Sequence, residues 1–343
     1  HTSLAVDRQC GQALGMVAQD LFHRKQAPAA ETPAQRLARE RESEVWGRVI
    51  DSVGTAPQGT VYRHVFDRGA DNYEVFCRLC HNECEWVVRA AQTHRMIVLR
   101  DGRRTSLSDA LSERVVRGTR TVQVKAQKKQ PARTAKVEMR YLRITVPRPK
   151  SVSPWVRQEG PVQIEMSAVQ LLEPNPPKGC QAVNWVLLTS DQVKKPSQAR
   201  QVIADYEKRP VVEELHKAAK TGCRLESRQY RTAARLERVS AVQCVIAVRL
   251  LQLRAHARLT PDRPAMEVVP EEWVRVLPQV RHRGRHQDPV TMTVRDFYRS
   301  LAMLGGFVGR KNDGEPGWIT IWRGLEKLHL ILRGIQYYRS SCG

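Results

Sequence analysis

Three segments in the middle of the chain alternate apolar and polar side chains with a period of two. They cover residues 119–127, 135–146 and 162–172. This period is typical of antiparallel strands that bury one face, and Pro174, Pro176 and Pro177 close the block. We therefore predict an antiparallel β region at residues 101–190, inside a chain whose 343 residues are enough for two or three domains.

The segments on either side of this region are mixed. The predicted elements before it are strands at 2–6, 13–19, 61–66 and 86–89 and helices at 32–53 and 72–80. After residue 197 the apolar spacing is mostly helical, most clearly over residues 236–258. With one further strand in front, this is the order of an RNase H-like fold. The predicted fold class is α/β: an RNase H-like core interrupted by an antiparallel β insertion, plus a helical C-terminal region.

The charge of the chain points to a polyanionic partner. The formal net charge is +22, which costs stability through self-repulsion and is commonly explained by nucleic-acid binding. A basic structural protein would show the same balance. Residues 114–150 hold twelve Lys or Arg and one acidic residue, Glu138. We interpret the strands there as placing many cations on one face that follows phosphates, the alternative being a solvated outer face.

The sequence offers less support for a membrane protein or a zinc-binding protein. No stretch approaches the roughly 20 apolar residues of a membrane helix, and the eight cysteines are scattered as in a reduced cytoplasmic protein. Cys77, Cys80 and Cys84, with His81 among them, could form a zinc site. The same segment is predicted to be an amphipathic helix running into a strand, and the chain has no second C-x2-C pair, so zinc is the less favoured interpretation.

One cluster of charged residues surrounds a predicted helix start. The pattern is Tyr206-x2-Arg209-x3-Glu213-x6-Lys220. Pro210 disfavours helix for Arg209 and suits the first turn of a helix that begins there. On that helix Glu213, Lys217 and Lys220 would share one face. The spacing alone fits both a surface helix with ordinary Glu–Lys pairs and a metal-binding carboxylate flanked by groups that grip DNA phosphates.

This pattern resembles the YREK signature of bacterial insertion-sequence transposases, the cut-and-paste group that includes the kanamycin-transposon enzyme. Residues 213–222, EELHKAAKTG, resemble the family's E-E-x-H-K-A-x-K-T-G. Residues 66–71, FDRGAD, resemble the C-D-R-E-A-D segment that bears the family's second catalytic aspartate. Further similar segments are 176–179, 185–190, 236–238, 247–254 and 304–307, together with Trp318 and Trp322.

The resemblance implies roles for individual residues. Asp67 and Glu213 are the catalytic carboxylates and ligands of two Mg²⁺ ions, with Mn²⁺ able to substitute. The residues implied in DNA binding are Tyr206, Arg209, Lys217, Lys220, Trp185 and Arg89. Among these, Trp185 would stack on a base flipped out during hairpin formation, and Arg89 would touch the same strand. The alternative for Trp185 is a core tryptophan in a buried strand.

The resemblance also implies an activity and partners. A DDE transposase of this type cleaves double-stranded DNA at the inverted-repeat ends of its element and joins the ends to target DNA. Each step is a phosphoryl transfer at the same metals. Two ends are paired, so a homodimer on DNA is expected. The expected parts are a first core segment at 1–100, the β insertion at 101–190, a second core segment at 191–258, and a helical dimerisation region at 259–343.

The chain departs from the family pattern near its start. Relatives carry their first catalytic aspartate in a D-x-T-x-L segment that this sequence lacks, and residues 1–4 match the family's second strand better. Asp7 is then a turn residue. We therefore expect the first aspartate and an N-terminal DNA-end-recognition domain upstream of residue 1, and no DNA cleavage by this chain alone. Gly69 stands where relatives often carry Glu, and Arg68 would contact either a phosphate or Asp71.

Two other functions stay open at this level. One is another RNase H-like nuclease, such as a junction resolvase, against which the YREK pattern argues. The other is a non-catalytic DNA-binding remnant of a decayed element, which would keep the fold without the chemistry.

Overall fold

The contacts of the chain divide it into two compact units. Unit 1 consists of residue 1 and residues 18–209, and unit 2 consists of residues 2–17 and 210–343. The structure is a computed structural model. It describes all residues except 23–25, 27, 29, 33, 34, 37, 38, 40, 125, 127–130, 228, 282–288, 342 and 343.

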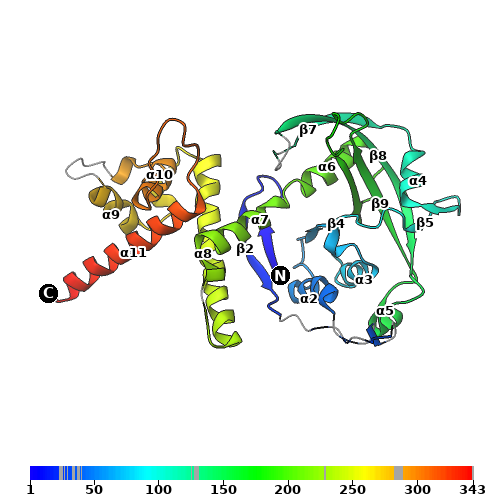
Figure 1. Ribbon diagram of the computed structural model, residues 1–343, viewed down its shortest axis with the longest axis horizontal. Coiled ribbons are helices and arrows are strands. Elements are labelled where there is room, and N and C mark those ends of the chain that lie inside the picture. The colour runs from blue at the N-terminus through cyan, green and yellow to red at the C-terminus, as the bar shows by residue number, and fades with distance from the viewer. Residues whose placement is uncertain are drawn as a thin grey trace. The chain divides into compact units, whose positions relative to one another are not determined.

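Unit 1 is built on a mixed eight-stranded sheet (Figure 1). Its strands are β3 (Arg63–Phe66), β4 (Glu85–Arg89), β5 (Met96–Val98), β6 (Arg104–Ser106), β7 (Gly118–Val124), β8 (Arg133–Pro147), β9 (Gln163–Leu172) and β10 (Asn184–Thr189). The spatial order is β3-β4-β10-β9-β8-β5-β6, and β7 also pairs with β8. β3 and β4 are parallel, and the other pairs are antiparallel. The antiparallel β region is confirmed, and it continues the same sheet that contains β3 and β4.

Helices cover both faces of this sheet because successive strand residues point to opposite sides. Trp86 and Val88 of β4 belong to the core beneath four helices, α2 (Val45–Val53), α3 (Tyr73–His81), α4 (Leu107–Ser112) and α5 (Pro154–Glu159). Val87 between them belongs to the core beneath α6 (Pro196–Tyr206). The predicted α/β class is therefore confirmed for this unit.

The helix expected over residues 32–53 is confirmed only in its second half. Arg41 has an extended backbone and precedes a short 3₁₀ turn, η1 (Glu42–Glu44), so the long helix is interrupted before α2 begins. The Thr32 hydroxyl accepts a hydrogen bond from the Gln35 amide, as the side chain of a helix N-cap residue does. Part of the first half lies outside the described residues.

Unit 2 is mainly helical. Its helical elements are α7 (Pro210–Lys217), the π-helix η3 (Ala218–Gly222), η4 (Leu225–Ser227), α8 (Ala233–Leu259), η5 (Ala265–Glu267), α9 (Glu271–Arg281), η6 (Pro289–Thr291), α10 (Val294–Leu304) and α11 (Trp318–Ser341). All of these elements except η4 and η6 contribute side chains to one apolar core. The α10–α11 crossing is very close, since a Cβ added at Gly324 would lie 1.9 Å from the Leu301 carbonyl oxygen. The helical C-terminal region is thus confirmed.

The two predicted N-terminal strands are present as β1 (Thr2–Val6) and β2 (Ala13–Gln19). They form a separate two-stranded sheet instead of joining the large one. Apolar packing explains this, because Ala13 is buried in the helical core of unit 2. The Gln252 side chain of α8 also donates to the carbonyls of Ala13 and Leu14. Asp7 lies in the connecting turn and accepts from the amides of residues 9 and 10, as predicted for a turn residue.

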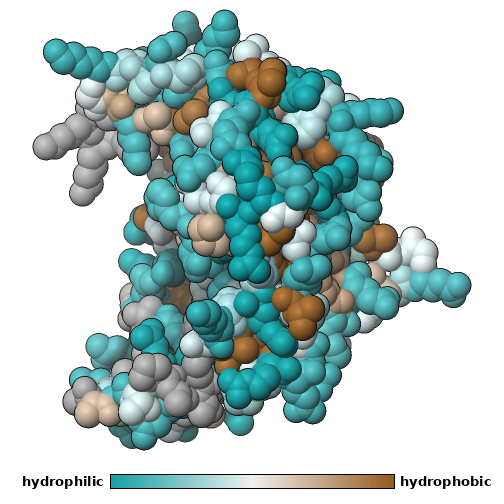
Figure 2. Space-filling model, turned by 90° about the vertical axis from the view of Figure 1, so that its right-hand side faces the viewer, coloured by the Kyte–Doolittle hydropathy of each residue, from teal (hydrophilic) through white to brown (hydrophobic). Residues whose placement is uncertain are grey.

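The cations of residues 114–150 do not form a single phosphate-binding face among the described residues. Alternation along β8 puts Lys136 and Arg140 on one face and Arg133 and Arg143 on the other. Four arginines are neutralised by glutamates: Arg120–Glu207, Arg133–Glu173, Arg140–Glu138 and Arg143–Glu165. Figure 2 shows mainly hydrophilic side chains on the sheet-bearing side, with hydrophobic ones in small separate groups.

Within the described ranges, no helix combines the length and apolarity needed to cross a membrane.

Candidate functional site

Asp67 follows the last residue of β3, at the end of the parallel β3–β4 pair. Its Oδ1 atom accepts from the Gly69 amide at 3.0 Å, so the side chain caps the 3₁₀ turn η2 (Arg68–Ala70). The side chain remains 44% exposed. The carboxylate is therefore held by its own turn while it stays accessible to a ligand from solvent.

Arg209 lies beside this carboxylate. Its Nη2 atom donates to Asp67 Oδ2 at 2.8 Å, although the two residues are 142 positions apart. Arg209 comes just after α6, and the following Pro210 begins α7. The structure thus brings together one residue from the FDRGAD segment and one from the YREK pattern, both of which the sequence assigned to the site.

The turn after Asp67 is anchored by Asp71. The buried Asp71 carboxylate accepts from the amides of Ala91 and Gln92 at 2.6 and 2.9 Å and pairs with Arg95. It therefore fastens this turn to the loop that follows β4. The Arg68–Asp71 salt bridge considered from the sequence is replaced by Arg95–Asp71, and the exposed Arg68 stays available for a phosphate.

Trp46 of α2 explains the glycine at position 69. A Cβ added to Gly69 would lie 2.7 Å from the Trp46 ring. The same ring contacts the imidazole of His1, with centroids 4.3 Å apart. In this chain an aromatic ring fills the space that a side chain at position 69 would need.

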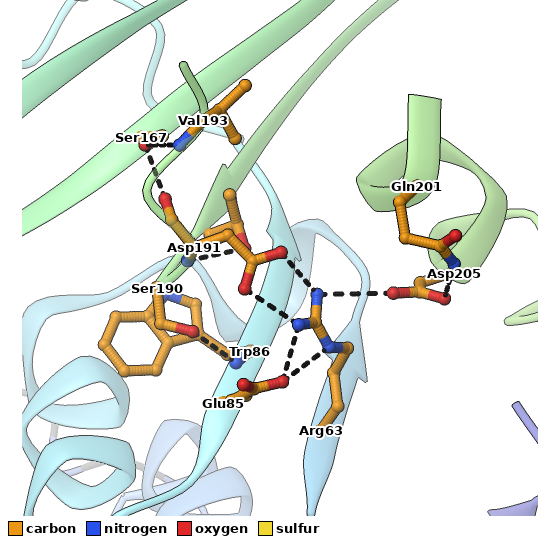
Figure 3. A network of polar contacts seen from close by, with 10 residues as sticks. Arg63, Glu85, Trp86, Ser167, Ser190, Asp191, Val193, Gln201 and Asp205 are labelled. Carbon is orange, nitrogen blue, oxygen red and sulfur yellow. Dashed lines mark hydrogen bonds and ion pairs between the residues drawn. The ribbon is translucent and has the colours of Figure 1, made fainter. Parts of the chain in front are cut away.

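Arg63 ties the strand of Asp67 to three other elements (Figure 3). Its guanidinium bonds to Glu85 of β4, to Asp191 beyond β10 at 2.8 Å, and contacts Asp205 of α6 at 3.2 Å. The Arg63 and Asp205 side chains are 10% and 2% exposed. Because Asp205 directly precedes Tyr206, this cluster fixes the end of α6 against β3. No pattern in the sequence indicated this cluster.

Trp185, Tyr206 and Arg89 form a second cluster in unit 1. The Trp185 and Tyr206 rings meet edge to face with centroids 5.5 Å apart. The Arg89 guanidinium carbon lies 5.7 Å from the Trp185 centroid, and its Nη2 atom donates to the Asn184 carbonyl at 3.4 Å. Trp185 is half-buried and Tyr206 is 6% exposed. Tyr206 therefore contributes to this cluster by packing, which the sequence did not predict, and its expected contact with DNA stays a prediction.

Glu213, Lys217 and Lys220 belong to unit 2. Glu213 is exposed in the first turn of α7. The helix changes to π geometry after Lys217, and the wider turn rotates Lys220 away from the face it would occupy on a continuous α-helix. The prediction of one shared face is therefore wrong at Lys220. The lysine ammonium groups lie beside other glutamates, Lys217 at 3.2 Å from Glu214 and Lys220 at 2.9 Å from Glu226.

The cysteine cluster does not resemble a zinc site. Cys77 is buried in the core of unit 1, and this burial raises the pKa of its thiol to about 12, so it stays protonated. In the part of the chain that the structure describes, no three His, Cys, Asp or Glu side chains are grouped so that they could hold a metal ion.

Comparison with known families covers almost the whole chain. Residues 38–247 match the family described as the transposase DDE domain. Residues 245–343 match the transposase Tn5 dimerisation domain. The first match spans more than half of the chain and contains both the FDRGAD segment and the YREK pattern. The mixed sheet, the flanking helices and the helical C-terminal region of the chain agree with the RNase H-like fold of such enzymes. The chain belongs to the DDE transposase family.

Proposed function

We propose that this protein is a cut-and-paste transposase of the YREK type, which cleaves double-stranded DNA at the inverted-repeat ends of its element and joins the ends to target DNA. The Asp67–Arg209 contact carries this proposal. It joins a candidate metal-binding carboxylate to a guanidinium suited to bidentate phosphate recognition. An ordinary surface ion pair would not unite two separate family motifs.

We assign Asp67 and Glu213 as carboxylate ligands of Mg²⁺. Both are accessible, and Mg²⁺ prefers oxygen ligands and keeps several waters, so a small number of carboxylates suits it. When bound, two such ions supply activation of the attacking oxygen and stabilisation of the leaving oxygen. The Gly69 amide and Arg209 hold Asp67 in place. Arg209 can also donate hydrogen bonds to a DNA phosphate, so that it orients the substrate beside this carboxylate.

The DNA-binding residues divide into two kinds. Arg209, Lys217 and Lys220 supply cations for backbone phosphates. Trp185 supplies a stacking surface, and Arg89 beside it supplies a cation for the same strand. The contact with the buried Tyr206 fixes the edge of the Trp185 ring. A fixed ring loses less freedom when a base stacks on it, and such stacking is worth about 1–3 kcal/mol per base.

We propose that the protein acts as a homodimer on DNA, with residues 259–343 forming the interface. The match to a dimerisation domain supports this assignment. Three large apolar or aromatic residues in the second half of α11 are also strongly exposed: Leu330, Tyr337 and Tyr338. We also propose that it acts in the bacterial cytoplasm at the nucleoid, where element ends and target DNA would both be present.

A cleavage assay tests the assignment of the carboxylates. The protein encoded by the longest reading frame that contains this chain is incubated with labelled inverted-repeat ends and Mg²⁺. Four forms are compared: wild type, Asp67→Asn, Glu213→Gln and Glu113→Gln. Glu113 is a matched control because it is an exposed glutamate paired with Arg103. We expect the wild type and the control to cut, and the other two to bind DNA with at least about a thousandfold less cleavage.

Each contrary result has a defined meaning. A wild type that binds the ends and never cuts them would overturn the enzymatic proposal and support a non-catalytic DNA-binding protein. Full cleavage by Asp67→Asn or Glu213→Gln would show that the corresponding carboxylate is not a metal ligand. A wild type that binds neither these ends nor other DNA would overturn the DNA-binding assignment.

A further inference from the structure

Glu214, next to the proposed ligand Glu213, lies at the centre of a polar cluster in unit 2. Its Oε2 atom accepts from Arg254 of α8 at 3.0 Å and from the Trp318 indole of α11 at 3.3 Å. Its Oε1 atom accepts from Lys217 one turn later on α7. Both carboxylate oxygens of Glu214 are therefore engaged, and two of the three contacts reach other helices.

The partners of Glu214 also contact each other. The Arg254 guanidinium carbon lies 4.5 Å above the centre of the Trp318 ring, in a cation–π arrangement. Trp318 is 8% exposed and is part of the helical core. Two of the side chains that bind Glu214 are therefore held against each other as well as against its carboxylate.

This cluster joins the two family domains within unit 2. Glu214 lies inside residues 38–247, the DDE match, and outside the dimerisation match. Arg254 and Trp318 lie inside residues 245–343, the dimerisation match, and outside the DDE match. Helix α7, which carries the proposed catalytic residue Glu213, is therefore bonded through the Glu214 side chain to the domain that is expected to form the dimer.

α7 needs such an anchor because it is short. It has eight residues and is followed by the π-helix η3, and a helix of that length is not stable without tertiary contacts. Leu215 is 1% exposed and fixes one side of α7 in the core. Glu214, one residue or about 100° earlier around the helix, fixes a second side. Two anchors on different sides of a helix determine its rotation, and this rotation sets the direction of Glu213.

We propose that Glu214 is a positioning residue for the reaction: by binding Arg254 and Trp318, it holds α7 in the rotation that presents Glu213 to metal. This inference rests on the proposed role of Glu213 as a metal ligand. Residues that orient a metal ligand typically change metal affinity about 10–100-fold when altered. Glu214 would therefore act on metal dependence more than on DNA affinity.

The test compares Glu214→Gln with the control Glu267→Gln in the same full protein. Gln can still accept from the Trp318 indole but loses the charge that pairs with Arg254. Glu267 forms an exposed pair with Arg263 in the same unit. We expect Glu214→Gln to raise the Mn²⁺ concentration for half-maximal cleavage about tenfold or more, with DNA affinity within about twofold of wild type. Hydrogen exchange of the α7 amides should also become faster. The control should change neither quantity.

Two further variants keep the inference open to refutation if Glu214→Gln folds poorly. Trp318→Phe removes a single donor and retains a ring in the core. The double variant Glu214→Arg with Arg254→Glu exchanges the two charges and so restores an ion pair between these positions. It should recover part of the metal affinity that Glu214→Gln loses. Unchanged Mn²⁺ dependence in Glu214→Gln and Trp318→Phe, with an active wild type, would overturn the positioning role alone. A wild type that never cuts DNA would instead overturn the proposed function and this inference together.

Discussion

The two candidate metal-binding carboxylates are supported in different ways. Asp67 directly follows a strand of a large sheet and is held by the Gly69 amide and by Arg209. Glu213 is exposed on an eight-residue helix, which its neighbours Glu214 and Leu215 connect to the rest of unit 2. The backbone ladder of a sheet places a residue directly, whereas a short helix relies on its side-chain anchors. We therefore expect the position of Asp67 to depend on the stability of unit 1, and the position of Glu213 to depend on the local orientation of α7.

The largest effect is expected at Arg63. Arg63→Met removes the nearer of two cations from the nearly buried Asp205, since Lys208 lies 4.0 Å away, and it also removes the links to Glu85 and Asp191. Removing one partner of a buried charge cluster costs about 3–5 kcal/mol, which urea unfolding would measure. Arg103→Met, which breaks an exposed pair with Glu113, should have little effect. The comparison fails if Arg63→Met is no more destabilising than Glu214→Gln.

Acid should weaken unit 1 through His64. This residue of β3 is buried, and its burial lowers its pKa from 6.5 to about 4. The unfolded chain therefore takes up the proton first, so the stabilisation is fully present above pH 6.5 and is lost as the pH falls toward 4. The loss should reach about 2.5 kcal/mol by pH 4.5.

The measurement is the free energy of unfolding between pH 7.5 and 4.5, for wild type and for His64→Phe. The difference between the two proteins isolates His64 from the carboxylates that also titrate. We expect the wild type to lose stability relative to the variant as the pH falls. Parallel pH profiles would show that His64 is not buried in its neutral form.

Unit 2 should be most sensitive where α10 and α11 cross. Gly324→Ala would place a methyl group 1.9 Å from a backbone oxygen, so the helices must separate, at about 1–3 kcal/mol or more. Gly334 lies on the same helix and has no atom within 4 Å of an added Cβ. Gly334→Ala should therefore stabilise α11 by about 0.5–1 kcal/mol. The unfolding temperatures of both variants test these expectations. Equal shifts in the two variants would contradict the close crossing of α10 and α11.

The smallest effects concern the proposed phosphate contacts. Arg209→Gln in unit 1 and Lys220→Gln in unit 2 should each lower the slope of log affinity against log salt by about 1. Titrations of end DNA over a range of NaCl concentrations measure this slope. Arg209→Gln should also reduce cleavage because it releases Asp67, while Lys220→Gln should act mainly on binding. If only one variant changes the slope, the other residue does not contact a phosphate.

The sequence predicted local structure better than it predicted long-range contacts. The strands of residues 2–6 and 13–19 and the three alternating segments were visible because side-chain period follows backbone geometry. Asp67 and Arg209 were assigned to the site through motifs, and they do lie together. Their roles as metal ligand and phosphate contact stay predictions.

The missed features share a physical cause. The Arg63 cluster joins residues that are 22 and 128 positions apart, and no local pattern encodes such a contact. The π-helix after Lys217 depends on tertiary packing more than on its composition, since AAKTG also suits an ordinary helix end. The separate β1–β2 sheet follows from the burial of Ala13 among helices more than 200 residues later.

A change of metal-ligand chemistry tests the central claim most directly. Asp67→Cys and Glu213→Cys replace each proposed oxygen ligand with sulfur, which binds Mn²⁺ better than it binds Mg²⁺. Cleavage of inverted-repeat ends is measured in each metal, with Glu113→Cys as the control. We predict that both variants are inactive with Mg²⁺ and recover activity with Mn²⁺, while the control cuts with either ion. Cleavage by either variant at the wild-type rate in Mg²⁺ would contradict the assignment of that residue as a metal ligand.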